Sequence, residues 1–440
     1  MRINLFTSKL AVLACFAPIG LAALPLNAST VSFSSLTAGQ NHACVIAATQ
    51  PNPRSSVVLE QDVMCWGNNE FGQLGNHSGI PMSSYADSVP RKVDGISGSV
   101  KQLSAGDGFT CALLTTGAVQ CWGGDTYGVL GKTDWTVADP WPSYGNTPTP
   151  LTIPHFSVSV PATQISSGAT HVCALQYDGY VLCWGDNRNL ELGASASVEY
   201  SPTPLYVALP YPAISVSAGD GFSCAVLEPN SSAKFIALPQ VWCWGSDDHA
   251  QLGDGQLTLQ GNKKDPVQVT GLNLYTVAIS AGDAGACAFD LNGQEQCWGD
   301  DDAGEIGNGV PNQTSTTPSP EFVSLGPVRM MANGSTRFAN CSTMLSQSGV
   351  ACWGLNSWAL LGSTFNSADA YLPVANKLTN ATEISIGLDF ACAISTSDLL
   401  LGVNAQHVYC WGHNDYGQVG NGATTFSYWS SAVASPTEIL

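Results

Sequence analysis

The sequence predicts an all-β protein, a seven-bladed β-propeller built from four-stranded blades. Three observations predict it. Fourteen of the fifteen cysteines fall into seven successive pairs, each second cysteine is followed by Trp-Gly, and each repeat holds four short alternating segments. The second cysteines are separated by 56, 62, 60, 54, 55 and 58 residues. A period this regular indicates an internal repeat, which decides the architecture.

One complete repeat spans residues 214–269. Its four short segments are separated by Gly, Asp, Asn and Pro, and they cover residues 214–218, 223–227, 241–244 and 266–269. Apolar and polar residues alternate with period two along them, which is typical of strands rather than helices. Four such strands make one propeller blade.

Each cysteine pair lies on the second and third predicted strands of its repeat. Opposed residues of a non-hydrogen-bonded antiparallel pair have Cα atoms about 4.5 Å apart, within the range that a disulfide bridges. We therefore expect one disulfide inside each blade, worth about 3 kcal/mol in a chain-entropy account that is itself disputed. The predicted pairs are Cys44 with Cys65, Cys111 with Cys121, Cys173 with Cys183, Cys224 with Cys243, Cys287 with Cys297, Cys341 with Cys352, and Cys392 with Cys410.

Metal ligation is the competing interpretation of these cysteine pairs. A zinc site needs two close pairs, or a pair with histidines, typically spaced as C-x2-C. No cysteine pair in the sequence has that spacing. We therefore predict structural disulfides, no metal and no cofactor, and seven disulfides imply an oxidising compartment.

Residues 1–28 are predicted to be a signal peptide. Arg2 and Lys9 precede an apolar stretch at residues 10–26, and small residues follow before a cleavage point. The propeller would then span residues 29–440. This predicts a secreted protein, either extracellular or periplasmic.

Two other interpretations of this leader remain. A membrane anchor is one, although Pro18, Gly20 and Pro25 interrupt the stretch and leave it short of a clean span of about 20 residues. A lipoprotein cleavage site before Cys15 is the other, although the apolar run before it is very short. No other apolar run approaches membrane length, so we expect no membrane span in the mature chain.

The charge balance limits the class of partner. Charged residues make up only 11% of the chain, and the net charge is −19, or −21 without Arg2 and Lys9. A chain this acidic is not expected to bind a polyanion such as nucleic acid. A basic partner suits it better.

The repeat resembles the regulator of chromosome condensation repeat, whose blades carry Gly, His, a short Ala-Leu strand, Trp-Gly and then Asn-x-x-Gly-Gln-Leu-Gly. Residues 38–44 (AGQNHAC), 65–75 (CWGNNEFGQLG) and 410–420 (CWGHNDYGQVG) carry the match. The resemblance covers the chain after the leader. It implies the propeller fold and a monomer that acts through its faces and rims.

The resemblance also suggests how the ring closes. Residues 31–39 begin inside a repeat, and residues 435–440 are similar to the fourth strand of other repeats, such as residues 201–206. We therefore expect the last strand to join the first three strand segments in one blade. Such closure would protect the strand edges that an open array exposes.

The chain departs from the family at the histidine position of the repeat. Histidine occupies it in two blades, and other blades have different residues there: His42 and His171 against Phe109, Phe222, Gly285 and Phe390. No ring of histidines exists to do chemistry. We interpret both histidines, and the seven tryptophans that follow the second cysteines, as core residues.

Aspartates gather in the predicted first and third connections of the blades, which emerge on one face of a simple meander. They are Asp107, Asp220, Asp283 and Asp389 in first connections, and Asp125, Asp186, Asp247, Asp248, Asp300, Asp301, Asp302 and Asp415 in third connections. The functional interpretation is an acidic ring for a basic partner or Ca²⁺. The competing one is that Asp is simply a favoured turn residue, and no calcium loop fits the spacing.

The third connection of blade 2 is long and aromatic. It holds Trp135, Trp141 and Tyr144 among several prolines. Exposed Trp and Tyr are enriched in binding hot spots, so this loop completes our candidate binding surface. Packing of the loop against its own blade is the alternative.

Three functions remain open. The first is a protein-binding module, an interaction partner or inhibitor-like scaffold, because propellers of the family that the repeat resembles act mostly through their rims and faces. Secreted bacterial relatives inhibit β-lactamases through a propeller face, but no residue match carries that activity over to this chain. The second is guanine-nucleotide exchange on a small GTPase, the family's best-known activity, and the third is a lectin-like or adhesive role. HExxH, GxSxG and P-loop patterns are absent from the sequence, so we expect no enzyme.

Overall fold

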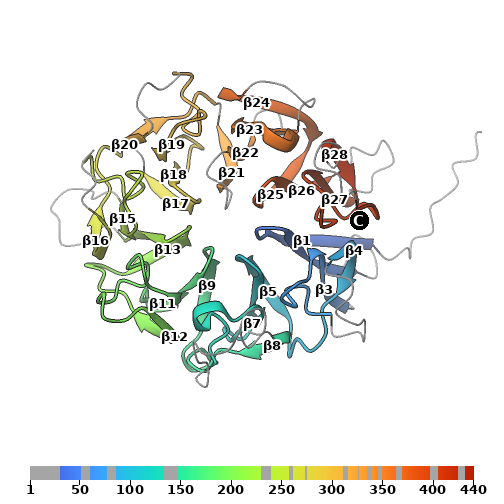
Figure 1. The fold of residues 1–440 in the computed structure, drawn as a ribbon, viewed down its shortest axis with the longest axis horizontal. Coiled ribbons are helices and arrows are strands. Elements are labelled where there is room, and N and C mark those ends of the chain that lie inside the picture. Colours follow the sequence, from blue (N-terminus) through green and yellow to red (C-terminus); the bar gives the residue numbers. More distant parts are fainter. Residues whose placement is uncertain are drawn as a thin grey trace, which may run out of the picture.

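The computed structural model describes the chain in fourteen segments. These are residues 30–50, 60–76, 86–132, 147–228, 239–256, 261–272, 275–310, 316–325, 327–333, 339–344, 349–362, 369–396, 405–424 and 432–440. Within them, 28 strands form seven four-stranded antiparallel sheets around a central axis (Figure 1). The predicted seven-bladed propeller is confirmed. The predicted leader, residues 1–28, lies outside the described residues.

The first four blades occupy the N-terminal part of the chain. Blade 1 holds β1 (Thr30–Ala38), β2 (His42–Gln50), β3 (Glu60–Asn68) and β4 (Ala86–Lys92). Blade 2 holds β5 (Val100–Ala105), β6 (Phe109–Leu114), β7 (Val119–Gly123) and β8 (Thr147–Thr152), with the short helix η1 (Thr126–Gly128). Blade 3 holds β9 (Ala162–Ser167), β10 (His171–Gln176), β11 (Val181–Asp186) and β12 (Tyr200–Tyr206). Blade 4 holds β13 (Ala213–Ala218), β14 (Phe222–Leu227), β15 (Gln240–Gly245) and β16 (Lys263–Gln268).

The other three blades complete the ring. Blade 5 holds β17 (Thr276–Ala281), β18 (Gly285–Asp290), β19 (Glu295–Asp300) and β20 (Thr316–Phe322). Blade 6 holds β21 (Val328–Asn333), β22 (Ala339–Met344), β23 (Gly349–Gly354) and β24 (Ala370–Thr379), with the short helix η2 (Ser357–Ala359). Blade 7 holds β25 (Ala381–Ile386), β26 (Phe390–Thr396), β27 (Gln406–Gly412) and β28 (Val433–Glu438).

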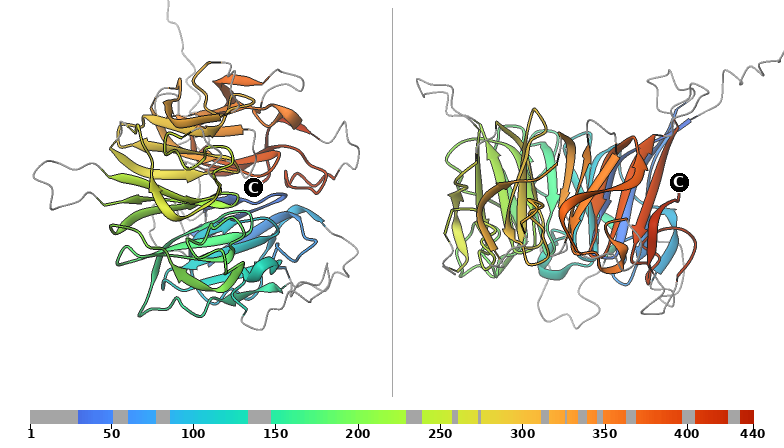
Figure 2. Two further views of the ribbon diagram at one scale, coloured as in Figure 1. Left: turned by 60° about the vertical axis from the view of Figure 1, so that its left-hand side comes forward. Right: turned by 90° about the horizontal axis from the view of Figure 1, so that it is seen from above.

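Every blade is a simple meander. Its strands are hydrogen-bonded in sequence order, with the first strand innermost and the fourth at the rim (Figures 1 and 2). The first and third connections of each blade therefore emerge on one face of the disc, which we call the channel face. The second and fourth connections emerge on the opposite face.

The cysteines of each pair face each other across the second and third strands. All seven predicted disulfides are present, with Cα atoms 4.0 to 4.1 Å apart. From blade 1 to blade 7 they join Cys44 to Cys65, Cys111 to Cys121, Cys173 to Cys183, Cys224 to Cys243, Cys287 to Cys297, Cys341 to Cys352, and Cys392 to Cys410. The predicted pairing is therefore confirmed in every blade.

The glycine that follows each blade tryptophan adopts a left-handed backbone. Its φ lies between 100° and 112° in all seven repeats, where an L side chain is strained. This explains why Gly follows Trp in every repeat.

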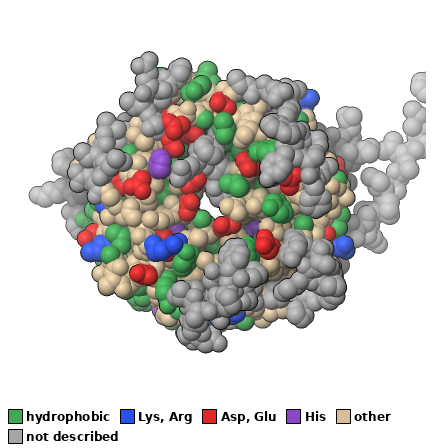
Figure 3. Space-filling model, viewed as in Figure 1, with side chains coloured by type: hydrophobic (Ala, Val, Ile, Leu, Met, Phe, Trp, Pro, Cys, Tyr) green, Lys and Arg blue, Asp and Glu red, His purple; other side chains and the backbone are tan. Residues whose placement is uncertain are grey.

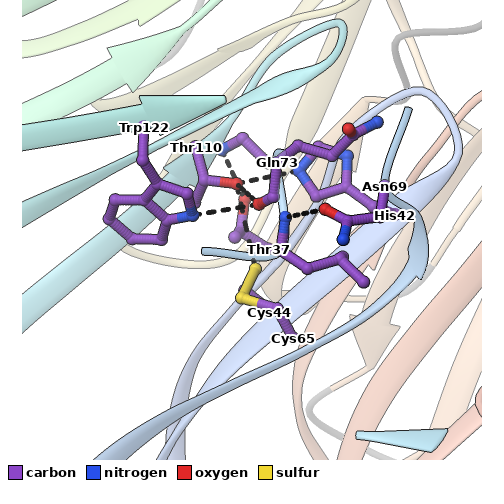
Figure 4. Close-up of a disulfide and its surroundings, with 10 residues drawn as sticks. Thr37, His42, Cys44, Cys65, Asn69, Gln73, Thr110 and Trp122 are labelled. Carbon is purple, nitrogen blue, oxygen red and sulfur yellow. Dashed lines mark hydrogen bonds between the residues drawn. A yellow bond between two sulfur atoms is a disulfide. The ribbon is translucent and has the colours of Figure 1, made fainter. Parts of the chain in front are cut away.

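The blade tryptophans join neighbouring blades. Each buried indole N–H donates to a backbone carbonyl in the third connection of the preceding blade, at 2.7 to 2.9 Å. Trp122, for example, donates to Gln73 (Figure 4). The prediction that these tryptophans are core residues is confirmed.

The predicted closure of the ring is wrong. Blade 1 contains its own fourth strand, β4, and β28 pairs with β27 in blade 7. Blades 1 and 7 are separate sheets that contact each other, and two of the contacts are side-chain acceptors: Gln406 accepts from the Phe33 N–H at 2.7 Å, and Glu383 from the Leu36 N–H at 2.9 Å. Each blade is thus built from one continuous repeat, because residues 86–92 supply the strand that the prediction took from the C-terminus.

Candidate functional site

The central channel is narrow and polar, and it opens on the channel face. Its cavity of about 430 Å³ is lined mostly by Ser, Ala, Gly and Thr of the first strands and by the first connections. Five glycines pack blade against blade around it: Gly39, Gly106, Gly168, Gly219 and Gly387. A Cβ on Gly168 would lie 2.1 Å from the Gly219 carbonyl oxygen, so no side chain fits there.

Backbone hydrogen bonds tie neighbouring first connections together. The Asp107 N–H donates to the Ala169 carbonyl at 2.9 Å, and the Asp220 N–H to the Gly282 carbonyl at 3.0 Å. On the other side of the ring, the Leu388 N–H donates to the Gln40 carbonyl at 3.0 Å. The rim of the channel is therefore a fixed frame for the side chains that it carries.

Three of the predicted surface aspartates meet at this rim. Asp107, Asp220 and Asp283, which we call the mouth carboxyls, all line the channel opening. Acidic side chains surround the central opening in Figure 3. Part of Asp107 is exposed to solvent, but protein atoms surround most of its carboxyl. This partial burial raises its pKa to about 6, and the charge of Asp220 adds to the rise. Negative charge is therefore crowded at the mouth.

Five other predicted surface aspartates are buried instead. Asp125, Asp186, Asp247, Asp300 and Asp301 have 0%, 1%, 3%, 5% and 2% of their surface exposed. Asp125 accepts the Leu130 N–H at 2.8 Å and Asp301 the Ile306 N–H at 3.1 Å, so both hold the turn of the third connection. Asp186 instead binds the side chain of Arg188. Their assignment to a binding surface is corrected, because turn formation and blade packing take these carboxyls out of solvent.

The remaining predicted aspartates lie on the channel face without joining the mouth. Asp248 and Asp302 are exposed in the third connections of blades 4 and 5. In blade 7, Asp415 lies 2.9 Å from the imidazole of His413, and burial raises the pKa of Asp389 while His413 opposes that rise. The aromatic residues Trp135, Trp141 and Tyr144 lie outside the described residues.

The two histidines of the repeat are core residues. His42 bonds the Thr110 hydroxyl of the next blade at 2.8 Å (Figure 4), and His171 bonds the Ser223 hydroxyl at 2.7 Å. Burial lowers their pKa values to about 3 and about 4. Both rings are therefore neutral near pH 7, as inter-blade packing requires.

Sequence reasoning missed three buried glutamates. Burial is the main cause that raises the pKa values of Glu191, Glu295 and Glu305 to about 8. A signal was available for Glu295, because the other six blades carry Val at this position, two residues before the second cysteine. Glu191 and Glu305 lie seven residues after the blade tryptophan, where blades 1, 4 and 7 carry Gln, so this replacement can also be seen when the repeats are compared.

One group in the described residues has the spacing of a metal site. Cys287, Glu295 and Cys297 offer ligand atoms within 4.8 Å of one another. The two sulfurs are joined in a disulfide, however, so they are not available as thiolate ligands. The group therefore fits no metal in this state.

Comparisons with known proteins agree with the repeat pattern. Models of the regulator of chromosome condensation (RCC1) repeat match residues 62–113, 178–226 and 240–289, and a second model matches residues 100–129 and 162–189. The E3 ubiquitin-protein ligase HERC2 of Mus musculus is 26% identical over 413 residues, which are 92% of this chain. The chain spans only 8% of the length of that ligase.

Solved structures share the architecture. Prp20p from Saccharomyces cerevisiae, described with its binding to Gsp1p and histones, matches with a TM-score of 0.69 and 20% identity, covering 86% of each chain. Human WBSCR16 matches with a TM-score of 0.69 and 17% identity, covering 86% of this chain and 94% of its own. Identities this low establish the fold alone. In the described residues, no helix is long and apolar enough to cross a membrane.

Proposed function

Because this chain belongs to the regulator of chromosome condensation repeat family, we propose that it is an exported protein-binding propeller whose channel face binds a basic protein. The observation that carries the proposal is the convergence of the mouth carboxyls on one rigid rim. Burial is the main cause of the raised pKa of Asp107, and the negative charge of Asp220 raises it further. Positive side chains of a partner would offset this negative charge, and complementary charge steers association as well as fixing register.

Export is the second part of the proposal. The leader-like residues 1–28 and the seven disulfides support it, because disulfides persist in oxidising compartments. Intact mass of the natural protein, with and without thiol alkylation, tests it. A chain beginning near Ser29 with no free thiol is the expected result. A full-length reduced chain would overturn export and favour nucleotide exchange on a small GTPase inside the cell.

The binding face is tested with an oligolysine peptide as the probe. We expect the triple variant Asp107→Asn, Asp220→Asn, Asp283→Asn to bind it at least about tenfold more weakly, a loss of about 1.4 kcal/mol. The matched control neutralises three exposed carboxyls of the opposite face, Asp94→Asn, Asp178→Asn and Glu228→Gln. Equal losses in both variants would mean that net charge alone attracts the peptide, and would contradict the proposed face.

A further inference from the structure

A small cavity opens beside the mouth, between blades 5 and 6. In five other blades a buried ring fills the equivalent position: His42, Phe109, His171, Phe222 and Phe390. Blade 5 has Gly285 there, and a cavity of about 20 Å³ lies beside it, lined by Asp283, Asp300, Glu305 and Asn340 among others. That volume holds about one water-sized group. We call this cavity the blade-5 socket.

Two buried carboxyl oxygens line the socket without a hydrogen-bond partner. They are Oδ1 of Asp300 and Oε1 of Glu305, and each residue is only 5% exposed. Burial raises the pKa of both carboxyls, and the charge of Asp302 raises that of Asp300 further. Buried polar atoms without partners are costly, and buried charges are normally paired. The socket therefore presents acceptors that call for a donor.

Blade 3 shows how the chain satisfies the aspartate of the same pair elsewhere, whereas Oε1 of its glutamate, Glu191, has no hydrogen-bond partner there either. Asp186 and Glu191 occupy the positions of Asp300 and Glu305, and the Arg188 guanidinium donates to Asp186 at 2.7 Å. The ring of His171 fills the cavity position there.

Blade 5 has no cation at the matching position of its own repeat. At the position of Arg188 it carries the exposed carboxyl of Asp302. In blade 4, Lys263 lies 3.5 Å from Asp247. Among the described residues, no lysine or arginine forms an ion pair with Asp300, Asp302 or Glu305. His249 opposes the rise in the pKa of Asp300 electrostatically.

We propose that the blade-5 socket binds one primary ammonium group, supplied by a lysine of the basic partner. This inference rests on the proposed function, and it specifies the chemical group of the basic partner that the channel face would recognise. An ammonium has three N–H donors and no acceptor, which suits the two unpartnered acceptors, Asp300 Oδ1 and Glu305 Oε1, and Asn340 also lines the cavity. The Asn340 amide nitrogen is already engaged, because it donates to the Glu305 carbonyl at 2.8 Å. A guanidinium or a trimethylated ammonium is too large for the cavity.

The test compares two peptides of equal charge on the full chain. One is oligolysine and the other is the same peptide with every lysine trimethylated, which keeps the charge but removes the N–H donors. We expect the trimethylated peptide to bind at least about tenfold more weakly, or about 1.4 kcal/mol. Equal binding of the two peptides would overturn the proposal that the blade-5 socket binds an ammonium group, but not the proposal that the channel face binds a basic protein. Binding of neither peptide would overturn both proposals.

Two variants close or neutralise the socket. Gly285→Phe supplies the ring of blades 2, 4 and 7, and Glu305→Gln supplies the amide of blades 1, 4 and 7. A Cβ at Gly285 would lie 2.8 Å from the Trp298 carbonyl oxygen, so the second variant guards against misfolding of the first. Both should abolish the preference for oligolysine, whereas Glu191→Gln in blade 3 should keep it. A preference that survives in folded Gly285→Phe and in Glu305→Gln would overturn the proposal.

Two other sources of a cation are distinguished in the same series. Ammonium chloride should compete with oligolysine better than tetramethylammonium chloride at equal ionic strength. If ammonium raises the melting temperature while the two peptides bind equally, the occupant is the free ion and the lysine is excluded. Arg337 lies outside the described residues, and a preference that appears only in Arg337→Gln would show that the chain fills its own socket.

Discussion

The indole Nε1 of Trp66 donates a hydrogen bond of 2.9 Å to the backbone carbonyl of Gln418. Trp66 belongs to the first blade and Gln418 to the last, so this bond crosses the point where the ring closes. Trp184 makes the same bond to Val129, at 2.8 Å, in the interior of the ring. Closure thus uses the contact that joins every other pair of blades, and the N- and C-terminal blades need no shared sheet.

We predict that Trp66→Phe destabilises the protein about as much as Trp184→Phe. Each substitution leaves a buried carbonyl without its donor, which costs about 1–3 kcal/mol, and each removes part of a fully buried side chain. Urea unfolding followed by far-UV circular dichroism measures both losses. A much smaller loss for Trp66→Phe would show that the closing interface is weaker than the others.

The glycines around the channel give a second prediction. Gly168→Ala places a Cβ 2.1 Å from the Gly219 carbonyl oxygen, a backbone atom that cannot move freely. Overpacking of this kind costs about 1–3 kcal/mol. The control is Gly98→Ala, where the nearest atom is 3.8 Å away. If thermal unfolding shows equal effects for the two variants, the blades are not in contact at these glycines.

Much of the architecture could be predicted from the sequence because all seven repeats carry the same pattern of cysteines, Trp-Gly and short strands. Cys111 and Cys121 stand opposite each other as expected, since a short meander fixes the register of its second and third strands. The fourth strand of blade 1 was missed because Ala86–Lys92 is half exposed and carries little alternation. Strand pairing across a long connection depends on packing that a single segment does not reveal.

The candidate site was less predictable. Asp107 and Asp125 are both turn aspartates in sequence, yet one lines the channel and the other is buried under its own turn. The difference arises from the neighbouring blade, which covers third connections and leaves the innermost first connections open. The cavity at Gly285 was not predicted, although Gly285 stands where five other blades carry a ring, because the sequence alone does not show whether neighbouring side chains fill the space that the missing ring leaves.

Acid lability should depend on the buried histidines. Burial lowers the pKa of His171 to about 4 from 6.5, so the unfolded chain takes up the proton first as the pH falls. The stability linked to this group is full above about pH 6.5 and is lost towards pH 4. We expect His171→Phe, the residue of blades 2, 4 and 7, to flatten the fall in unfolding free energy between pH 6.5 and about 4. His42 keeps its own contribution in that variant, so a reduced slope is expected and an unchanged one would contradict the assignment.

Loss of stability towards alkaline pH should depend on Glu295. This carboxyl is buried beside the Cys297 sulfur, accepts from the Ser342 hydroxyl at 3.1 Å, and has a pKa raised to about 8 by burial. Because the folded chain holds this proton more tightly than the unfolded chain, the linked stability is full below about pH 4.5 and is lost as the pH rises to about 8.

The double variant Glu295→Val, Ser342→Ala tests this link with residues that the chain already uses. Six other blades carry Val at the first position, and Ala112, Ala174, Ala225, Ala288 and Ala393 occupy the second. We expect its unfolding free energy to fall less between pH 5 and 8 than that of the unaltered chain, because about 1.4 kcal/mol is linked to each pKa unit removed. Glu191 and Glu305 leave a residual slope in both proteins. Chemical denaturation at several pH values gives the two curves, and parallel curves would mean that Glu295 is already ionised in its core and that blades 5 and 6 tolerate the charge.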